Sequence, residues 1–495
     1  MCDNMDHIAI LSELFVRNGN RPKYLALADA VEQAFREGLL APGDSLPPQR
    51  ILARALGITL GTTGRAYAEA AARGLVEASV GRGTFIRSQR PDVDVMPPDM
   101  PEHEHAPERD NPFMQERTAR KSELNLGFIA PFEYLNPSLS QALRELAGQS
   151  ASSLDALQSY QRPGGMLRHK DAGAKWAAGY GLPVKPEELL ICAGSQHALL
   201  TVLTSLCSPG DRIAAETLSY PLLRQLARRL RIQIVPIRTD AGGMSPEALD
   251  NACRGNMPGN RIRAVYLMPS CRNPTLTCMN LERRKALVEL CRRHDLLILE
   301  DDVFALAQKR SLSLPPLASL APERTCFIAA TSEVLGGGLR VAYLCPPQYH
   351  LEKLEQTISY TISMVPPLMA ELASRWILDG TAWRVLEAKR NEAAIRNMLA
   401  RDILDGFELV TRGTGFFCWL RLPEPWTGER FADAARSRGI LVAEGEHFSM
   451  GHGMTEHGVR IALGGTTDRQ ALAEGLKILS SLLQGEKQVL FHSCH

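Results

Sequence analysis

The sequence is poor in the features that mark membrane and secreted proteins. No apolar run approaches the ~18 residues of a membrane-spanning helix. Its first residues, MCDNMDHIAILSEL, have no basic segment before the apolar one and do not resemble a secretory signal. The eleven cysteines include no CxxC pair, and no His/Cys cluster has zinc-site spacing. We therefore expect a cytoplasmic protein with free thiols and no metal site.

Composition gives little further direction by itself. A net charge of +1 averages over unlike regions and does not identify a partner. The apolar content of 45% and the charged content of 22% are those of an ordinary globular protein. A chain of 495 residues is too long for one hydrophobic core, so we predict several domains.

Three helical patterns and a hairpin pattern occupy residues 24–87. The runs YLALADAVEQAFREG, LPPQRILARAL and ITLGTTGRAYAEAAARGL predict helices, and Gly38, Gly57 and Gly74 mark their ends. The run VEASVGRGTFI then predicts two short strands around a glycine-containing turn. Three helices followed by a hairpin form a winged helix-turn-helix.

The charge of this segment favours DNA as its partner. Between Ser45 and Arg90, seven arginines stand against two acidic residues. DNA binding needs such a local excess, because neutralised phosphates supply much of the affinity. Thr59, Thr62 and Arg65 lie near the start of the third helix, the end that enters the major groove in this motif. The alternative is a winged domain used only for protein contacts.

In order and spacing, PGDSLPPQRILARALGIT, TTGRAY and GRGTFI resemble the GntR class of transcriptional regulators. The resemblance implies that the chain binds double-stranded DNA. By position it assigns DNA contacts to Arg50, Thr59, Thr62, Arg65, Arg82 and Gly83. Leu60 stands where the class usually has an arginine, so that contact is missing.

A second folded region follows residues 89–123, whose prolines and mixed charges predict an extended linker. Beyond it, seven apolar runs alternate with amphipathic helical patterns, which predicts an α/β domain with a largely parallel sheet. The runs are LLICAG, RIAAE, IQIVPI, RAVYLMP, LLILEDD, CFIAA and RVAYLCP. A ligand of such a domain binds at the carboxyl ends of the strands.

Several polar residues follow these strands. Ser195 and Gln196 open a helix after LLICAG, where free backbone amides can bind an anion. Tyr220 is able to stack on a planar ring, and the amide of Asn273 is able to donate to a phenolate oxygen. Asp301 is able to hold a protonated ring nitrogen. Taken singly, Ser195 is equally well an ordinary helix cap, and a lone tyrosine such as Tyr220 is more often a core residue.

The combined order of GSQ, Tyr, NPT, EDD, Ser…Arg and RIAL resembles the fold-type I aminotransferases, which use pyridoxal phosphate (PLP), over residues 124–485. With the winged helix, the chain is similar to the MocR subfamily of GntR regulators. The resemblance implies a homodimer in which both subunits line each site. It divides the chain into a winged helix-turn-helix domain (1–88, core 20–88), the linker (89–123), a large domain (124–365), a small C-terminal domain (366–485) and a tail (486–495).

The resemblance also assigns roles by position. Cofactor contacts fall on Ser195, Gln196, Tyr220, Asn273, Asp301 and Arg340, and Tyr160 matches a tyrosine that reaches the neighbouring subunit's phosphate. Arg460, in HGVRIALGG, matches the arginine that holds a substrate carboxylate, a task suited to its bidentate geometry.

The segment FIAATSEVLGGGLRVAYLCP departs from this pattern at the chemistry. Ser332 and Arg340 are in register, but Glu333 occupies the position of the lysine that forms the Schiff base with PLP. No other lysine lies in this segment. Ala330 also replaces a phosphate-binding serine or threonine. Phe304 replaces a tyrosine, and Leu276 replaces the glycine of NPTG.

A carboxylate cannot form an imine with an aldehyde, so we expect no catalytic residue and no transamination. PLP or pyridoxamine phosphate (PMP) would bind only non-covalently. An amino-acid-like effector would pair its ammonium with Glu333 and its carboxylate with Arg460. The leading interpretation is a ligand-sensing transcriptional regulator. The alternatives are a working PLP-dependent aminotransferase with a DNA-binding head, an interaction module with two inactive sites, and a Glu333 that merely fills a vacated pocket.

Overall fold

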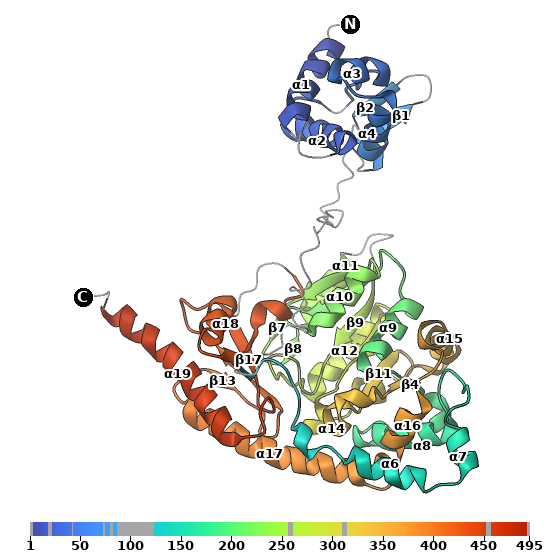
Figure 1. The fold of residues 1–495 in the computed structure, drawn as a ribbon, viewed down its shortest axis with the longest axis vertical. Coiled ribbons are helices and arrows are strands. Elements are labelled where there is room, and N and C mark those ends of the chain that lie inside the picture. Colours follow the sequence, from blue (N-terminus) through green and yellow to red (C-terminus); the bar gives the residue numbers. More distant parts are fainter. Residues whose placement is uncertain are drawn as a thin grey trace. The chain divides into compact units, whose positions relative to one another are not determined.

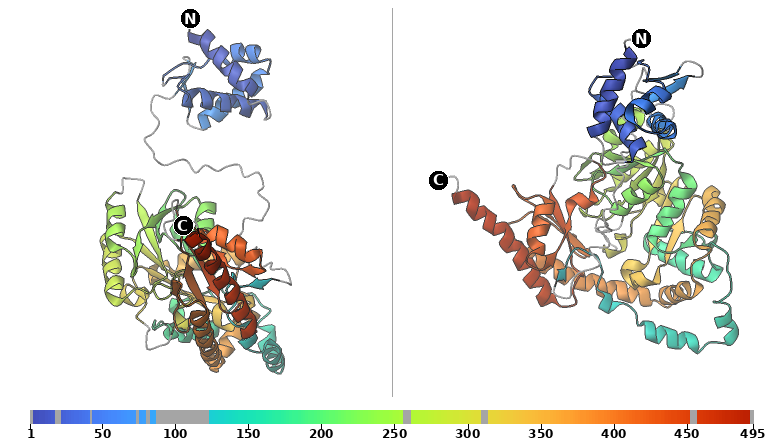
Figure 2. Two further views of the ribbon diagram at one scale, coloured as in Figure 1. Left: turned by 90° about the vertical axis from the view of Figure 1, so that its left-hand side faces the viewer. Right: turned by 45° about the horizontal axis from the view of Figure 1, so that its top comes forward.

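The computed structural model describes residues 3–17, 22–41, 43–72, 75–79, 83–86, 123–255, 261–308, 314–451 and 457–492. The chain forms two compact units, residues 1–106 and 107–495, shown from three directions in Figures 1 and 2. Within the described ranges, no helix is long and apolar enough to cross a membrane. Most of the expected linker lies outside these ranges, and the expected domain boundaries remain a prediction.

The N-terminal unit is a winged helix-turn-helix, as predicted. Its elements are α1 (Asp3–Arg17), α2 (Lys23–Arg36), α3 (Gln49–Leu56), α4 (Leu60–Ala72), β1 (Val76–Ser79) and β2 (Gly83–Ile86). The strands pair antiparallel. Gly57 ends α3 with φ of +61°, a conformation that costs a side-chain-bearing residue free energy. Helix α1, which packs on α2 and α3, was not predicted.

All seven predicted strands of the second region join one sheet in the order β4-β12-β11-β10-β9-β5-β6. They are β4 (Leu190–Cys192), β5 (Arg212–Glu216), β6 (Gln233–Ile237), β9 (Ile262–Leu267), β10 (Leu297–Glu300), β11 (Thr325–Ala330) and β12 (Ala342–Cys345). Strand β12 is antiparallel to both neighbours, and the neighbouring pairs from β11 to β6 are parallel. The predicted mostly parallel α/β domain is confirmed.

Helices and shorter elements surround this sheet. The helices are α6 (Leu139–Ala147), α7 (Ala151–Asp155), α8 (Leu167–Gly179), α9 (Ser195–Leu206), α10 (Pro221–Arg229), α11 (Pro246–Arg254), α12 (Leu281–Arg293), α13 (Leu317–Leu320), α14 (Ser332–Leu335), α15 (Leu351–Ile362) and α16 (Pro367–Leu378). The 3-10 turns are η2 (Glu133–Leu135), η3 (Pro186–Glu188), η4 (Ala305–Ala307), η6 (Gly337–Leu339) and η7 (Gln348–His350), and β7 (Thr239–Asp240) pairs with β8 (Gly243–Met244).

A smaller sheet near the C-terminus has the order β13-β14-β17-β16. Its strands are β13 (Leu409–Val410), β14 (Phe417–Arg421), β16 (Ala443–Glu444) and β17 (Gly458–Ala462), with α18 (Gly428–Arg436), η8 (Gly445–Phe448) and α19 (Arg469–His492). Helix α17 (Thr381–Ile403) contacts α14 and α16 beside the large sheet and α19 in the small domain, and it appears as one long helix in Figure 1. Strand β3 (Leu124–Asn125) pairs with β15 (Ile440–Leu441) of the small domain.

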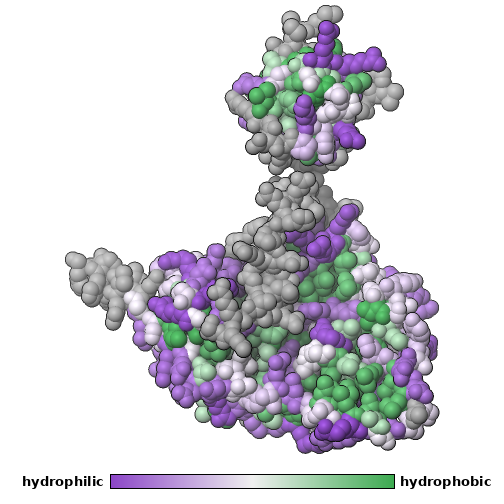
Figure 3. Space-filling view, in the orientation of Figure 1, coloured by the Kyte–Doolittle hydropathy of each residue, from purple (hydrophilic) through white to green (hydrophobic). Residues whose placement is uncertain are grey.

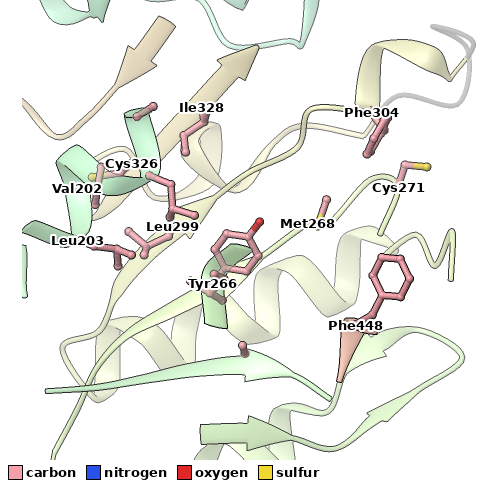
Figure 4. Close-up of a cluster of buried hydrophobic side chains, with 14 of the residues drawn as sticks. Val202, Leu203, Tyr266, Met268, Cys271, Leu299, Phe304, Cys326, Ile328 and Phe448 are labelled. Carbon is pink, nitrogen blue, oxygen red and sulfur yellow. The ribbon is translucent and has the colours of Figure 1, made fainter. Parts of the chain in front are cut away.

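The largest core cluster packs the strands of the large sheet against α9. Tyr266 of β9 stands among these side chains, with Leu299, Cys326 and Ile328 nearby and Phe448 from η8 toward another side (Figure 4). Its ring is fully buried, and its hydroxyl is directed to the carboxyl end of β10. The core of the large domain therefore extends up to the strand ends, where the polar residues lie.

Candidate functional site

The proposed DNA contacts of the N-terminal unit lie at the start of α4. Thr59 caps this helix: its Oγ1 accepts from the backbone N–H of Thr62 at 3.2 Å and shares a hydrogen bond with Thr62 Oγ1 at 2.8 Å. Arg50 and Arg65 are exposed on α3 and α4, and Leu60 is 47% exposed. The helix end therefore offers both cations and hydroxyls to solvent.

Two further DNA contacts were predicted in the hairpin. Gly83 begins β2, whereas Arg82 lies outside the described residues. The DNA-contacting roles of all six residues remain predictions.

In the second unit, Ser195 and Gln196 begin α9, as expected. Gln196 Nε2 donates to the hydroxyl of Tyr220 at 3.2 Å, which links two of the predicted site residues. Gly194 precedes the helix with φ of +84°, and a Cβ there would collide with the guanidinium of Arg340. Arg340 donates to the carbonyl of Ala193 at 3.4 Å. The exposed Arg340 and the α9 N-terminus thus form one positively polarised corner.

Asp301 follows β10 and is buried. Its Oδ2 accepts a hydrogen bond from Tyr266 at 2.7 Å, while its buried Oδ1 has no partner among the described residues. Burial raises the pKa of Asp301 to about 6, and the Tyr266 hydroxyl opposes that shift. Tyr266 therefore fixes Oδ2 of the carboxylate, and Oδ1 remains as an acceptor.

The two acids that flank Asp301, Glu300 and Asp302, accept hydrogen bonds from the backbone. Both oxygens of Glu300 accept backbone N–H groups at the start of α13, from Leu317 and Ala318. Asp302 accepts the backbone N–H of Ser270. These two carboxylates tie loops to the sheet, which leaves Asp301 as the one acid of the run with a buried oxygen that no described group satisfies.

Asn273 and Arg460 meet between the large and small domains. Asn273 Oδ1 accepts from Arg460 Nη1 at 2.9 Å, and Arg460 Nη2 donates to the carbonyl of Gly127. The guanidinium also lies 4.9 Å from the ring centre of Phe448, within the range of a cation–π interaction. Arg460 is only 5% exposed and is held in a fixed orientation.

Glu333 lies on α14, near the charged residues described above. Its Oε2 is buried without a hydrogen-bond partner among the described groups, and so is Oγ of the adjacent Ser332. Burial raises the pKa of Glu333 to about 7; Lys389, Arg460 and Arg340 oppose the shift, and Asp301 adds to it. Tyr160, by contrast, is 89% exposed, so this protomer alone gives it no place in the site.

Comparison with known proteins agrees with both halves of this description. Residues 23–86 match the bacterial regulatory proteins of the gntR family, and residues 132–478 match the aminotransferase class I and II family. The chain belongs to the aminotransferase class I and II family. Its gntR domain makes it a DNA-binding transcriptional regulator with an aminotransferase-like domain.

Two HTH-type regulators match this chain over nearly its whole length. The uncharacterised HTH-type transcriptional regulator YdeF of Bacillus subtilis is 32% identical over 94% of this chain and 96% of its own length. The HTH-type pyridoxine biosynthesis transcriptional regulator PdxR of Corynebacterium glutamicum is 25% identical over 90% and 94%. The structure of LysN, the α-aminoadipate aminotransferase of Thermus thermophilus, complexed with N-(5'-phosphopyridoxyl)-L-leucine, is 26% identical. It matches 76% of this chain and 95% of its own, with a TM-score of 0.66.

The aminotransferase class I and II family normally binds PLP, and two features of this domain suit such a group. Asp301 Oδ1 is a buried acceptor without a described partner, at the position where the resemblance places the ring nitrogen. Gly194 leaves room for Arg340 beside the α9 N-terminus. Within the described residues, no group of three or more His, Cys, Asp or Glu side chains could hold a metal ion.

The structure shows the surroundings of three residues that differ from the family pattern, Leu276, Phe304 and Ala330. Leu276 adopts φ of +55° although it is fully buried, which is the conformation that a glycine there would take without strain. Phe304 packs edge-to-face on Phe417 with ring centres 5.0 Å apart. The carbonyl of Ala330 accepts from Trp176 and Tyr180, so this strand end is held by its backbone.

Sequence reasoning missed two residues of this region. Tyr266, which orients Asp301, lies within an apolar strand pattern. Lys389 of α17 is 1% exposed, and its Nζ donates to Asn136 Oδ1 at 2.8 Å and to the carbonyl of Glu333 at 3.1 Å. A signal for Lys389 existed, because it stands in the buried stripe of α17 with Ala382, Leu386, Ala393 and Ala400. A lysine at such a position needs a partner.

Proposed function

We propose that the aminotransferase-like domain of this regulator is a sensor that binds an amino-acid-like ligand or a B6 vitamer non-covalently and does not transaminate. The observation that carries the proposal is Glu333, a carboxylate where the family resemblance places the reactive lysine. When PLP is bound in this fold, it supplies an electrophilic aldehyde and an electron-withdrawing ring. Glu333 offers no nucleophilic amine to that aldehyde.

The charges around Glu333 favour a ligand with an ammonium group. Glu333 is half-buried with its Oε2 enclosed, Asp301 is buried, and both acids have raised pKa values because burial disfavours their ionised forms. A ligand cation near Glu333 would remove much of that cost, and a protonated ring nitrogen would do the same at Asp301. PMP carries both groups. An α-amino acid carries the ammonium and a carboxylate for Arg460.

We propose that Arg340, Ser195 and Gln196 hold the phosphate of such a vitamer. Tyr220, Asn273 and Asp301 would hold its ring. Tyr160 would reach the site of a second subunit in a homodimer, which its exposure leaves it free to do. Apolar surface gathers around α14 and α16 in Figure 3, and exposed apolar side chains on neighbouring elements are Leu139, Leu143, Leu167 and Tyr360. Apolar exposure of this kind suits a subunit interface.

Calorimetry with PMP, PLP and a panel of amino acids tests the sensor. We expect binding of an amine-bearing ligand to the wild type and weaker binding to Glu333→Gln. The proposal fails if no ligand of these classes binds, or if Glu333→Gln binds them unchanged.

Borohydride treatment in the presence of PLP tests the alternative of a working aminotransferase. We expect no covalent adduct by mass spectrometry and no visible band of a PLP–lysine bond. A stable adduct would establish covalent cofactor attachment and overturn the non-catalytic assignment.

Salt-dependent binding to its own promoter region tests the DNA-binding residues. Arg65→Ala should weaken binding across sequences and lower the slope of log K against log salt by about 1 if Arg65 contacts a phosphate. Arg144→Ala removes an exposed arginine from α6 in the other unit and serves as the matched control. Equal slopes in the wild type and Arg65→Ala would remove Arg65 from the phosphate contacts.

A further inference from the structure

Lys389 is a buried lysine whose position is unusual for an ordinary structural residue. It lies on α17, more than fifty residues along the chain from Glu333, yet its Nζ is 3.1 Å from the Glu333 carbonyl oxygen. The second acceptor, Asn136 Oδ1, follows the η2 turn. The amide of Asn136 also lies close to Gly336, just after α14. The ammonium is therefore packed against the short helix that carries Glu333.

Burying this ammonium costs free energy, and two neighbouring carboxylates reduce that cost. Burial lowers the pKa of Lys389 to about 8, and the carboxylates of Glu333 and Glu133 oppose that shift. At pH 7 Lys389 is therefore mostly protonated. Among the charged groups that face Glu333, Lys389 has the largest lowering effect on its pKa, ahead of Arg460 and Arg340, while Asp301 acts in the opposite direction. Tyr180 and Tyr220 also lie within its electrostatic reach.

We propose that Lys389 is the positioning residue that keeps Glu333 ionised, so that the site selects ligands bearing an amine over ligands bearing an aldehyde. This inference rests on the proposed sensor function and names its ligand class. An ionised Glu333 attracts the ammonium of PMP or of an amino acid. It gives the aldehyde of PLP no such charge pairing, and it repels additional negative charge. Without Lys389, Glu333 would be protonated at neutral pH and this discrimination would weaken.

The wild type should accordingly bind PMP more tightly than PLP, with a PMP affinity that rises as pH increases through about 7, where Glu333 ionises. In Lys389→Met, which keeps the chain length and removes the charge, the midpoint of this rise should move to higher pH. At pH 7 a rise of one unit in the pKa of Glu333 lowers its ionised fraction from about one half to about one tenth, so the PMP-over-PLP preference should fall about 5-fold. Glu333→Gln should abolish the Glu333-dependent part of the profile.

Lys175→Met is the matched control. Lys175 also donates to a backbone carbonyl, that of Leu378 at 2.9 Å, but it lies on the exposed face of α8. Its loss should leave the pH profile and the preference unchanged. In the double variant Glu333→Gln/Lys389→Met, the lysine substitution should cause no further loss of preference, because the charge that it supports is already gone. A merely structural lysine would reduce affinity for both ligands equally, in either background, and that result would overturn the inference.

A second measurement needs no ligand and separates the two proposals. Glu333 has a folded-state pKa above its ordinary value, so the folded state binds more protons than the unfolded state between about pH 4.5 and 7. Its contribution to stability falls with rising pH across that window. In Lys389→Met this fall in stability should continue above pH 7. The reference is the pair Glu333→Gln and Glu333→Gln/Lys389→Met, in which Glu333 is absent and the lysine substitution should not change the pH dependence. Absence of PMP binding together with this extended fall would refute the sensor and retain the Lys389–Glu333 coupling; coincident curves would refute the coupling itself.

Discussion

Two buried carboxylates of the same site are stabilised in different ways. Asp301 is anchored by a hydrogen bond from Tyr266 of β9, whose ring belongs to the core of the large domain. Glu333 lies on a four-residue helix, and its Oε2 has no described hydrogen-bond partner. It depends on charges that come from α17, from β17 and from the turn after η6.

The difference separates a fixed binding group from an adjustable one. Asp301 directly follows β10 and accepts a hydrogen bond from Tyr266, so its position depends on the large sheet alone. The ionisation of Glu333 depends on Arg460 of the small domain and on Lys389 of the helix that connects the two domains. A shift of the small domain would therefore alter the charge of Glu333 and leave that of Asp301 nearly unchanged.

The strongest test of this comparison removes the fixed group. Asp301→Asn keeps the shape and loses the charge that holds a protonated ring nitrogen, so PMP affinity should fall by about 30-fold or more, as for truncated buried charge pairs. Calorimetry with PMP and with a ring-free amino acid measures this. The amino acid is the control ligand and should bind nearly as before. An equal loss for both ligands would show that Asp301 supports the site in general and not the ring.

The next test asks whether Arg340 serves the phosphate or the charge of Glu333. Arg340→Met should lower PMP affinity by about 10- to 100-fold, the range for a lost charge-assisted hydrogen bond, and should change the affinity of pyridoxamine, which lacks the phosphate, far less. Competition binding with the two vitamers measures the ratio. Equal losses of affinity for PMP and pyridoxamine would mean that Arg340 acts on the charge of Glu333 and not on the phosphate.

The sequence was sufficient for the elements whose pattern is local. Seven apolar runs predicted all the strands of the large sheet, and the strand-end rule then located Asp301 and Asn273. Tyr266 escaped because it lies inside an apolar strand pattern, and Lys389 escaped because its neighbours along the chain, Glu387, Arg390 and Glu392, are charged. Their roles depend on which elements meet in space: β9 lies beside β10, and α17 contacts α14. Helix α1 was not predicted, although its apolar residues recur at helical spacing.

The third test compares stability rather than binding. Glu333→Gln should raise the free energy of unfolding by roughly 1–3 kcal/mol at pH 8, because it removes a buried carboxylate whose ionisation the fold disfavours. At pH 5 the difference should shrink, since Glu333 is then protonated in the folded state. Denaturant unfolding at both pH values measures it. A change in the free energy of unfolding that is the same at both pH values would mean that the shape of the carboxyl group, and not its charge, matters.

The smallest expected effect concerns the anchor of Asp301. Tyr266→Phe removes the hydroxyl that opposes the raised pKa of Asp301, so that pKa should rise above about 6 and more Asp301 should be protonated at pH 7. PMP affinity at pH 7 should fall by about 5-fold, near 1 kcal/mol, and recover as the pH is raised. Tyr67→Phe is the control, since it deletes a buried tyrosine hydroxyl bond in the N-terminal unit. If Tyr266→Phe instead lowers affinity equally at every pH, the hydroxyl orients Asp301 without setting its charge, and the contrast with Glu333 becomes one of geometry alone.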